Sequence, residues 1–230
     1  MKTIHLLKKL EQYPLFTEND VIKLIKKSPA YTRTLLYRLH RNAYIYRIER
    51  GKYTVHADAL IFASYLATPS YISLSTALRY YNMIQQQPYS IFVMSPVPRK
   101  KVMFRGIPIL FITIKSSTLF GYKKERYNDF DIFMADPEKV LIDSLRYKLP
   151  LSDIVQALDT PEIDFGRLSD YAYRLGNTSL IKRLGYVLEK KKGLSYGLAA
   201  QDHNYIPLDY LGKKKGKKDK KWKLIINTEL

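Results

Sequence analysis

The first 56 residues carry apolar positions at the spacing of three short helices. Apolar residues recur three and four apart in residues 4–10, 21–25 and 35–39, as they do on one face of an amphipathic helix. Thr17 stands where it can cap the second helix, and Ser28 stands where it can cap the third. The pattern therefore predicts three consecutive helices whose apolar faces share a common core.

Two short strands are predicted after the third helix. Positions 44–48 alternate between apolar and polar residues, and residues 52–55 follow Gly51, which can take the positive φ of a tight turn. Three helices followed by a hairpin is the order of a winged helix-turn-helix, in which the third helix enters the major groove of DNA and the hairpin follows the backbone. We therefore expect a winged helix-turn-helix over residues 1–56.

Residues 57–210 have the pattern of a second, mixed α/β domain. The predicted elements are a helix over 57–66, a helix from Ser73 or Ser75, strands over 90–94, 101–104, 107–114 and 131–134, a helix capped by Asp136, and helices over 152–192. We expect the strands to form a small antiparallel sheet and the C-terminal part of this domain to be helical. The fold class predicted for the whole chain is α+β.

Excess positive charge is concentrated in the first and last segments of the sequence. The chain of 230 residues has 39 Lys and Arg against 21 Asp and Glu, a formal charge of +18. Residues 1–56 contain 12 basic and 4 acidic residues, residues 57–210 contain 19 and 15, and residues 211–230 contain 8 and 2. This asymmetry favours a polyanionic partner, above all double-stranded DNA, because Lys and Arg that neutralise phosphates release counterions. The alternative is a basic surface that only aids solubility, or the lysine enrichment of a heat-adapted protein.

The polar face of the third predicted helix supplies the candidate contacts to DNA. Residues early in a recognition helix lie deepest in the groove, and those expected to read base edges are Tyr31, Thr32, Arg33 and Thr34. The basic residues expected to hold phosphates are Arg38, Arg41, Arg47, Arg50 and Lys52. Tyr37 lies on the same helix, and the pattern is compatible with either a DNA contact or a place in the core.

A lysine-rich segment, residues 211–230, follows the second domain and is too charged to fold alone. Its candidate additional contacts to DNA are Lys213, Lys214, Lys215, Lys217 and Lys218. The apolar run 224–227 can pair as a terminal strand, which would make the lysines a hairpin loop that follows residues 205–211. The alternative is a solvated tail.

Few residues offer catalytic or metal chemistry. The chain has no cysteine, which excludes disulfides, thiol nucleophiles and thiolate metal sites, and its four histidines are scattered. Asp129 and Asp131 have the spacing of a Mg²⁺ pair, but neither a third carboxylate nor a Gly-Ser phosphate turn accompanies them. We therefore expect no metal, no cofactor and no catalytic residue. An enzyme, a nucleotidyltransferase that uses these two aspartates, is the least favoured hypothesis.

No segment has the pattern of a signal peptide or a membrane span. The first ten residues lack an apolar run of signal-peptide length, and no stretch reaches the roughly 18 apolar residues of a spanning helix. Together with a nucleic-acid partner, this pattern predicts a cytoplasmic, nucleoid-associated protein with no membrane contact.

Three short blocks of the sequence occur in an informative order. They are Arg50-Gly51-Lys52-Tyr53, Tyr71-Ile72-Ser73-Leu74-Ser75-Thr76-Ala77-Leu78, and Ala135-Asp136-Pro137-Glu138-Lys139-Val140-Leu141-Ile142-Asp143. In this order they resemble the AbiEi-like antitoxins and transcriptional regulators of type IV abortive-infection toxin–antitoxin systems, over roughly residues 1–190. The lysine-rich segment departs from the pattern of that family.

The resemblance implies a regulator with two domains. The winged helix would repress its own promoter at repeated or inverted sites, as a homodimer or as cooperative monomers, and the second domain would neutralise a cognate nucleotidyltransferase toxin. A stand-alone transcription regulator without a toxin is the second hypothesis. A neighbouring gene for a nucleotidyltransferase would favour the first hypothesis over the second.

Overall fold

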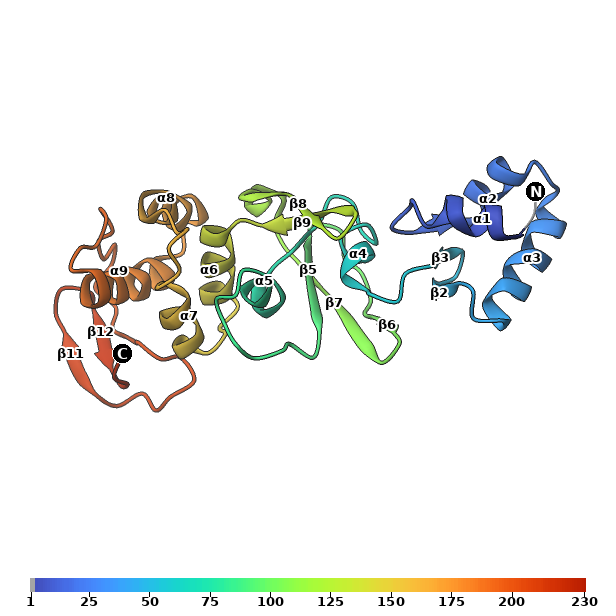
Figure 1. Cartoon of the computed structure of the whole chain (residues 1–230). Helices are drawn as coiled ribbons and strands as arrows, with labels where there is room; N and C mark the ends of the chain where they lie inside the picture. Colours follow the sequence, from blue (N-terminus) through green and yellow to red (C-terminus); the bar gives the residue numbers. More distant parts are fainter. Residues whose placement is uncertain (1–2) are drawn as a thin grey trace. The chain divides into compact units, whose positions relative to one another are not determined.

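The computed structural model describes residues 3–230, and Figure 1 shows the order of their elements. These residues form nine α-helices, one short 3-10 helix and twelve strands, so the predicted α+β class is confirmed. Contacts divide the chain into two compact units. The first unit comprises the chain up to Ile72, Tyr89–Leu119 and Lys124–Met134, and the second comprises Ser73–Pro88, Phe120–Lys123 and Ala135–Leu230. This division passes through the stretch that the sequence pattern treats as one domain, residues 57–210.

The first unit begins with three helices and three strands. They are α1 (Thr3–Leu10), β1 (Phe16–Thr17), α2 (Glu18–Ile25), α3 (Pro29–Arg41), β2 (Tyr46–Glu49) and β3 (Lys52–Thr54). The predicted order of helices and hairpin is confirmed, and β1 is an addition that pairs antiparallel with β3 to give the strand order β1-β3-β2. We call residues 3–56 the N-terminal module and β2–β3 with their turn the N-terminal hairpin.

The predicted caps set where α2 and α3 begin. The Thr17 hydroxyl oxygen accepts a hydrogen bond from the Asp20 N–H at 3.3 Å, and the Asp20 carboxylate accepts one from the Thr17 N–H at 2.8 Å, which is a capping box. The Ser28 hydroxyl oxygen accepts from the Tyr31 N–H at 3.3 Å, and Pro29 occupies the first turn of α3. Gly51 has the predicted positive φ, +77°, in the hairpin turn.

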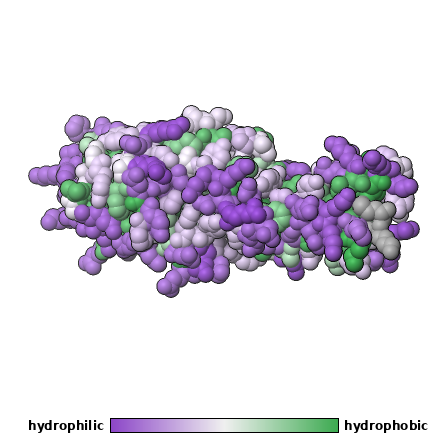
Figure 2. Space-filling model, turned by 45° about the horizontal axis from the view of Figure 1, so that its top comes forward, coloured by the Kyte–Doolittle hydropathy of each residue, from purple (hydrophilic) through white to green (hydrophobic). Residues whose placement is uncertain are grey.

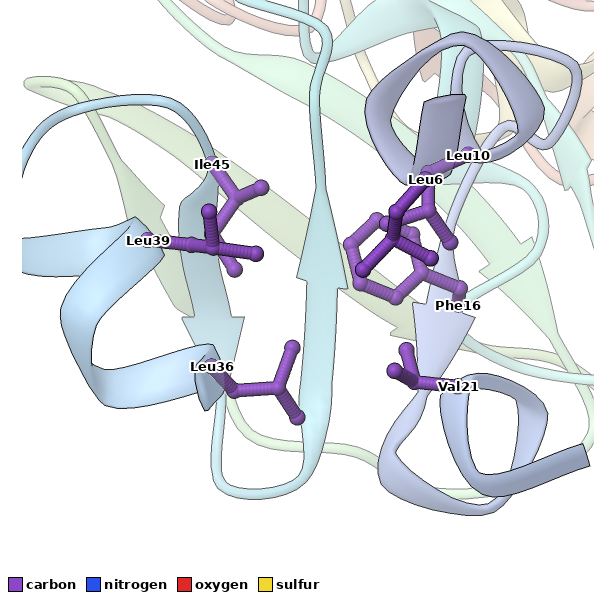
Figure 3. Packing of buried hydrophobic residues seen from close by; sticks show 7 residues of the cluster. All are labelled: Leu6, Leu10, Phe16, Val21, Leu36, Leu39 and Ile45. Carbon is purple, nitrogen blue, oxygen red and sulfur yellow. The ribbon is translucent and has the colours of Figure 1, made fainter. Parts of the chain in front are cut away.

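The N-terminal module has a hydrophobic core of its own. Seven buried side chains from its helices, from β1 and from the segment before β2 form one cluster: Leu6, Leu10, Phe16, Val21, Leu36, Leu39 and Ile45. Figure 3 shows how these side chains extend from their separate elements into the interior of the module. Burying a side chain of this size contributes about 1.5–3 kcal/mol, so this cluster holds the three helices and the hairpin together.

The main sheet of the first unit has six strands in the order β6-β7-β5-β4-β9-β8. The strands are β4 (Tyr71–Ile72), β5 (Ile91–Ser95), β6 (Val102–Phe104), β7 (Ile107–Thr113), β8 (Tyr122–Tyr127) and β9 (Phe130–Ala135), with a 3-10 turn, η1 (Ser116–Thr118), after β7. The prediction of an antiparallel sheet is wrong, because β7 pairs parallel with β5, and β9 pairs parallel with β4. The tight turn Arg105-Gly106 makes β6 and β7 antiparallel, whereas the longer loop after β5 carries the chain past the position that β7 fills.

The helix predicted over residues 57–66 is much shorter, since α4 spans only Leu60–Ala63. The Asp58 carboxylate accepts from the Leu60 N–H at 2.9 Å and marks its start. At the other end, the hydroxyl oxygen of Ser64 accepts from the Phe133 N–H at 3.2 Å, and the Ser64 carbonyl accepts from the Ser70 hydroxyl at 2.7 Å. Hydrogen bonds to other segments thus end a helix that the apolar pattern alone would extend.

The second unit contains five helices among its described residues. They are α5 (Leu74–Tyr80), α6 (Pro137–Arg146), α7 (Leu151–Ala157), α8 (Phe165–Leu175) and α9 (Thr178–Lys192). Helix α6 contacts the other four, and every residue from Glu138 to Leu145 is buried. Asp136 caps α6 as predicted, because its carboxylate accepts from the Lys139 N–H at 2.8 Å. Ser73 precedes α5, but its hydroxyl donates to the Asp143 carboxylate at 2.9 Å and does not cap the helix.

The lysine-rich segment folds into a small sheet that covers α9. Strand β12 (Leu224–Ile226) pairs antiparallel with β11 (Lys217–Asp219) and parallel with β10 (Ile206–Pro207). The predicted terminal strand is therefore confirmed, while the predicted hairpin between residues 205–211 and the terminus is not formed. The parallel pairing of β10 with β12 rules out that hairpin. Trp222 anchors the segment to α9: its side chain is 1% exposed, its indole N–H donates to Glu189 at 2.7 Å, and its ring lies against Gly185.

The visible surface is predominantly polar. Hydrophilic side chains cover most of the face shown in Figure 2, and the hydrophobic areas on it are smaller. The exposed large apolar side chains of the N-terminal module are Ile4, Tyr13, Tyr31, Tyr37 and Tyr44. Within residues 3–230, no helix combines the length and the hydrophobicity that crossing a bilayer requires.

Candidate nucleic-acid interface

Helix α3 presents a basic and aromatic face. The residues of this helix that the sequence pattern selected and that are exposed in the structure are Tyr31, Arg33, Thr34, Tyr37, Arg38 and Arg41. Tyr37 is 64% exposed and Tyr31 is 55% exposed, so Tyr37 belongs to this face and not to the core. Arg33, Arg38 and Arg41 on the same face supply positive charge beside these two aromatic rings. We call these six residues the α3 face.

Thr32 does not fit the prediction that it contacts a base. Its side chain is 0% exposed, and its hydroxyl donates to the Ser28 carbonyl at 3.0 Å. The helical period explains this difference, because Thr32 shares the buried side of α3 with Leu36 and Leu39. Thr32 therefore positions the start of the helix and is left out of the interface that we propose below.

Arg33 already has a partner in the free protein. Its Nε atom lies 2.9 Å from an Oε atom of Glu18 in α2, and both side chains remain accessible to solvent. An exposed ion pair of this kind contributes only about 0–1 kcal/mol, so a phosphate or a base edge can displace Glu18 at low cost. The ion pair lowers the effective charge of the α3 face until that displacement occurs.

The N-terminal hairpin contributes two exposed cations and one that is only partly exposed. Arg47 and Arg50 are exposed, and the Nε of Arg47 donates to the Glu49 carbonyl at 3.4 Å. Lys52 is only partly exposed, with its Nζ 3.1 Å from the Glu49 carboxylate and 3.4 Å from the Leu66 carbonyl. Lys52 thus has a structural task, whereas Arg47 and Arg50 are exposed cations on the hairpin that follows α3.

Sequence reasoning missed a second group of basic residues beside the hairpin. Arg99, in the loop before β6, donates hydrogen bonds to the Glu49 carboxylate and to the Leu66 carbonyl. The guanidinium of Arg105, in the turn after β6, lies 5.0 Å from the ring centre of Tyr46 in β2. The run Arg99-Lys100-Lys101 is visible in the sequence, but only the fold shows that it lies next to a hairpin 50 residues earlier.

The lysine-rich segment forms a separate basic surface in the second unit. The five lysines predicted to add DNA contacts are all exposed: Lys213, Lys214, Lys215, Lys217 and Lys218. The Lys218 ammonium lies 5.0 Å from the ring centre of Tyr205, and Lys223 lies 5.7 Å from the same ring. Lys217 and Lys218 are therefore held on strand β11, which limits how much conformational entropy they lose when they bind a polyanion.

One member of the aspartate pair considered for metal binding, Asp131, is engaged with cations. The Asp131 carboxylate lies 3.3 Å from an Arg126 nitrogen and 3.9 Å from Lys124 Nζ, and Asp129 is exposed in the turn before β9. Nowhere in residues 3–230 do three His, Cys, Asp or Glu side chains gather as a metal ion would require.

The second unit contains a buried polar cluster around the start of α6. The Lys139 ammonium donates to the Asp143 carboxylate, and both side chains are buried. The Tyr171 hydroxyl donates to Asp136 at 2.8 Å, and burial together with this bond raises the pKa of Tyr171 to about 12. Burial also raises the pKa of Asp136, against the two hydrogen bonds that lower it. Lys139 and Asp143 are fully buried and line none of the hollows found at this end of α6, so we assign their ion pair to stability.

No protein-family model matches this chain, and a search of curated proteins finds no similar sequence. The resemblance to the AbiEi-like regulators therefore rests on the three sequence blocks themselves.

Proposed function

We propose that this protein is a sequence-specific DNA-binding regulator of transcription and that its N-terminal module is a winged helix-turn-helix. One observation carries the proposal: an exposed α3 face, rich in arginine and tyrosine, and a basic hairpin that follows it in the chain belong to one module that has its own core. Exposed arginines on a helix with a capped N-terminus, as in α3, are suited to the major groove of DNA. A basic hairpin is suited to the adjacent phosphate backbone.

Each exposed residue has a role in this proposal. Tyr31, Arg33 and Thr34 lie in the first turns of α3 and would contact base edges. Four arginines further along the helix and on the hairpin would hold phosphates: Arg38, Arg41, Arg47 and Arg50. Tyr37 would pack against the sugar–phosphate backbone or a thymine methyl group, which its exposure permits.

The regulatory context comes from the sequence resemblance alone. We propose that the protein represses its own promoter and that the rest of the chain, with the helix that Asp136 caps, serves an antitoxin-like domain directed at a cognate nucleotidyltransferase toxin. A regulator that works without a toxin is the alternative. Co-expression with the product of a neighbouring nucleotidyltransferase gene, followed by growth measurement, distinguishes the two.

Footprinting and mobility shift on the chain's own promoter test DNA binding directly. The full-length protein should protect a discrete site, and Arg33→Ala should weaken binding to that site more than to random DNA of equal length. Arg38→Ala should weaken binding to both DNAs alike and reduce the slope of log K against log[salt] by about 0.9. Equal loss on promoter and random DNA for both variants would refute base reading by the start of α3.

A further inference from the structure

A shallow hollow of about 350 Å³ lies beside the N-terminal hairpin, within the first unit. Its polar lining comes from Glu49 at the end of β2 and from three consecutive basic residues before β6: Arg99, Lys100 and Lys101. Strand β2 contacts β6 directly, and the Tyr46 and Phe104 rings meet edge to face with centres 5.8 Å apart. The residues that line the hollow therefore come from the two elements that meet here, the hairpin and the edge strand β6 with its preceding loop.

The negative charge of this hollow is already compensated. Glu49 is the only acidic residue between positions 44 and 56, and its carboxylate accepts hydrogen bonds from Arg99 and lies 3.1 Å from Lys52 Nζ. Arg99 also donates to the Leu66 carbonyl, so its guanidinium is fixed in place. Arg99 thus removes the repulsion that Glu49 would exert on an anion and holds the loop that carries the next two lysines.

Lys100 and Lys101 carry the charge that remains. Both are exposed, and no acidic side chain among residues 3–230 forms an ion pair with either of them. Two unneutralised ammonium groups on the rim of a hollow attract a group of high negative charge density. A further cation, the Arg105 guanidinium in the β6–β7 turn, lies 5.0 Å from the ring centre of Tyr46 in the hairpin.

We propose that this hollow receives a phosphate of the DNA backbone, held by Lys100 and Lys101, so that the DNA footprint extends from the hairpin onto the sheet. The proposal rests on the proposed function, since it requires that the N-terminal module binds duplex DNA. A backbone phosphate is favoured over an acidic protein side chain, because the hairpin beside the hollow is the element that follows the DNA backbone in a winged helix. Contacts of this kind add affinity without reading sequence.

Salt-dependent binding of the full-length protein to promoter DNA tests the proposal. The double variant Lys100→Ala/Lys101→Ala should bind more weakly on promoter and random DNA alike, and the slope of log K against log[salt] should fall by about 2. The matched control is Lys190→Ala/Lys191→Ala, which removes the same charge from two neighbouring exposed lysines in the last turn of α9. The slope of this control should stay at the wild-type value.

The outcomes separate the two proposals. A wild-type protein that does not bind DNA refutes the proposed function and this extension with it. A wild-type protein that binds DNA with an α3-dependent footprint, while the Lys100→Ala/Lys101→Ala slope is unchanged or falls no more than that of the control, refutes the extension alone. Both double variants should unfold at the wild-type midpoint temperature, because neither pair of lysines is buried.

Discussion

The guanidinium of Arg99 donates a hydrogen bond to the carboxylate of Glu49 and so joins the N-terminal hairpin to the loop before β6. Lys52 lies on the other side of the same carboxylate, with its Nζ 3.1 Å away. Burial alone would raise the pKa of Glu49, but the hydrogen bonds and charges of Arg99 and Lys52 outweigh it and hold this pKa below the ordinary value of 4.5. The single acid of the hairpin therefore fixes two cations and is itself neutralised by them.

Replacing Glu49 by glutamine should destabilise the protein by about 1 kcal/mol at neutral pH, a modest figure because the carboxylate is partly exposed. The folded pKa of Glu49 lies below the unfolded one, so its contribution is complete above the unfolded pKa and disappears as pH falls through the folded pKa. The gap between the unfolding midpoints of wild type and Glu49→Gln should thus be constant near pH 7 and narrow below about pH 4.5.

Glu11→Gln is the control for this measurement, since Glu11 is an exposed acid of the same module. Its unfolding midpoint should follow that of the wild type at every pH. A gap for Glu49→Gln that persisted unchanged well below pH 4 would show that the ion pairs with Arg99 and Lys52 are not its cause.

Releasing Arg33 from Glu18 should strengthen DNA binding. In Glu18→Gln the arginine no longer has to leave a carboxylate 2.9 Å away, and one negative charge near the α3 face is removed. The value of an exposed ion pair predicts a gain of about two- to fivefold in affinity at moderate salt. Mobility shift with promoter DNA measures this gain, and Glu11→Gln again removes one acid without breaking the pair. Equal affinities of the two variants would count against a DNA contact by Arg33.

The structural features that the sequence predicts best are those that depend on residues close together in the chain. The caps at Thr17, Ser28 and Asp136 are present, because a hydroxyl or carboxylate three residues before a free N–H needs no distant partner. Helical period also predicts the core of the N-terminal module, and applied strictly it would have placed Thr32 beside Leu36 and not on the DNA face.

Distant partners account for what the sequence does not predict. Strand β1 has two residues and exists only because β3 pairs with it, and the parallel pairing of β5 with β7 depends on the path of a loop. The hydrogen bond between Glu49 and Arg99 joins residues 50 positions apart, and no local sequence pattern near either residue predicts it. The burial of Trp222 likewise cannot be predicted from a periodic pattern of apolar residues, because lysines surround it in the sequence. The sequence therefore predicts the terminal strand of that segment but not its packing on α9.

Adding a methyl group at Gly185 should loosen the lysine-rich segment. A Cβ atom at this position in α9 would overlap the buried ring of Trp222. Alanine gains about 1 kcal/mol of helix propensity over glycine, but overpacking a rigid ring costs about 1–3 kcal/mol, so Gly185→Ala should be destabilising overall. Limited trypsin digestion should then cut faster among the lysines after position 212.

Gly166→Ala provides the matched control, because Gly166 lies in α8, where a Cβ would meet only the Asp164 carboxylate at 3.2 Å. This variant should keep or raise the unfolding midpoint, with digestion of the lysine-rich segment at the wild-type rate. If Gly185→Ala behaved in the same way, the Trp222 contact would not be what holds the segment on α9.

Removing the carboxylate of Asp143 should be among the most damaging changes in the second unit. Asp143→Ala would take the buried Lys139 ammonium away from its carboxylate and the Ser73 hydroxyl away from its acceptor. Breaking a buried ion pair from one side costs about 3–5 kcal/mol, whereas replacing both partners with apolar residues costs far less. Chemical denaturation should therefore show Lys139→Met/Asp143→Leu to be more stable than Asp143→Ala, and the reverse order would contradict the assignment of this cluster to stability.

The lysines of the lysine-rich segment should add affinity for DNA but no preference for sequence. Changing Lys213, Lys214, Lys215, Lys217 and Lys218 to glutamine removes five exposed charges and leaves Trp222 and its contact with Gly185 intact, so the segment should stay folded. Each lysine that neutralises a phosphate contributes about 0.9 to the magnitude of the slope of log K against log[salt]. The slope of the variant should therefore be smaller by the contribution of between one and five lysines. Its affinity for promoter and random DNA should fall by the same factor, because ammonium groups bound to phosphates carry no base information. An unchanged slope would mean that these lysines face solvent in the complex, and a loss confined to the promoter would mean that they contact bases.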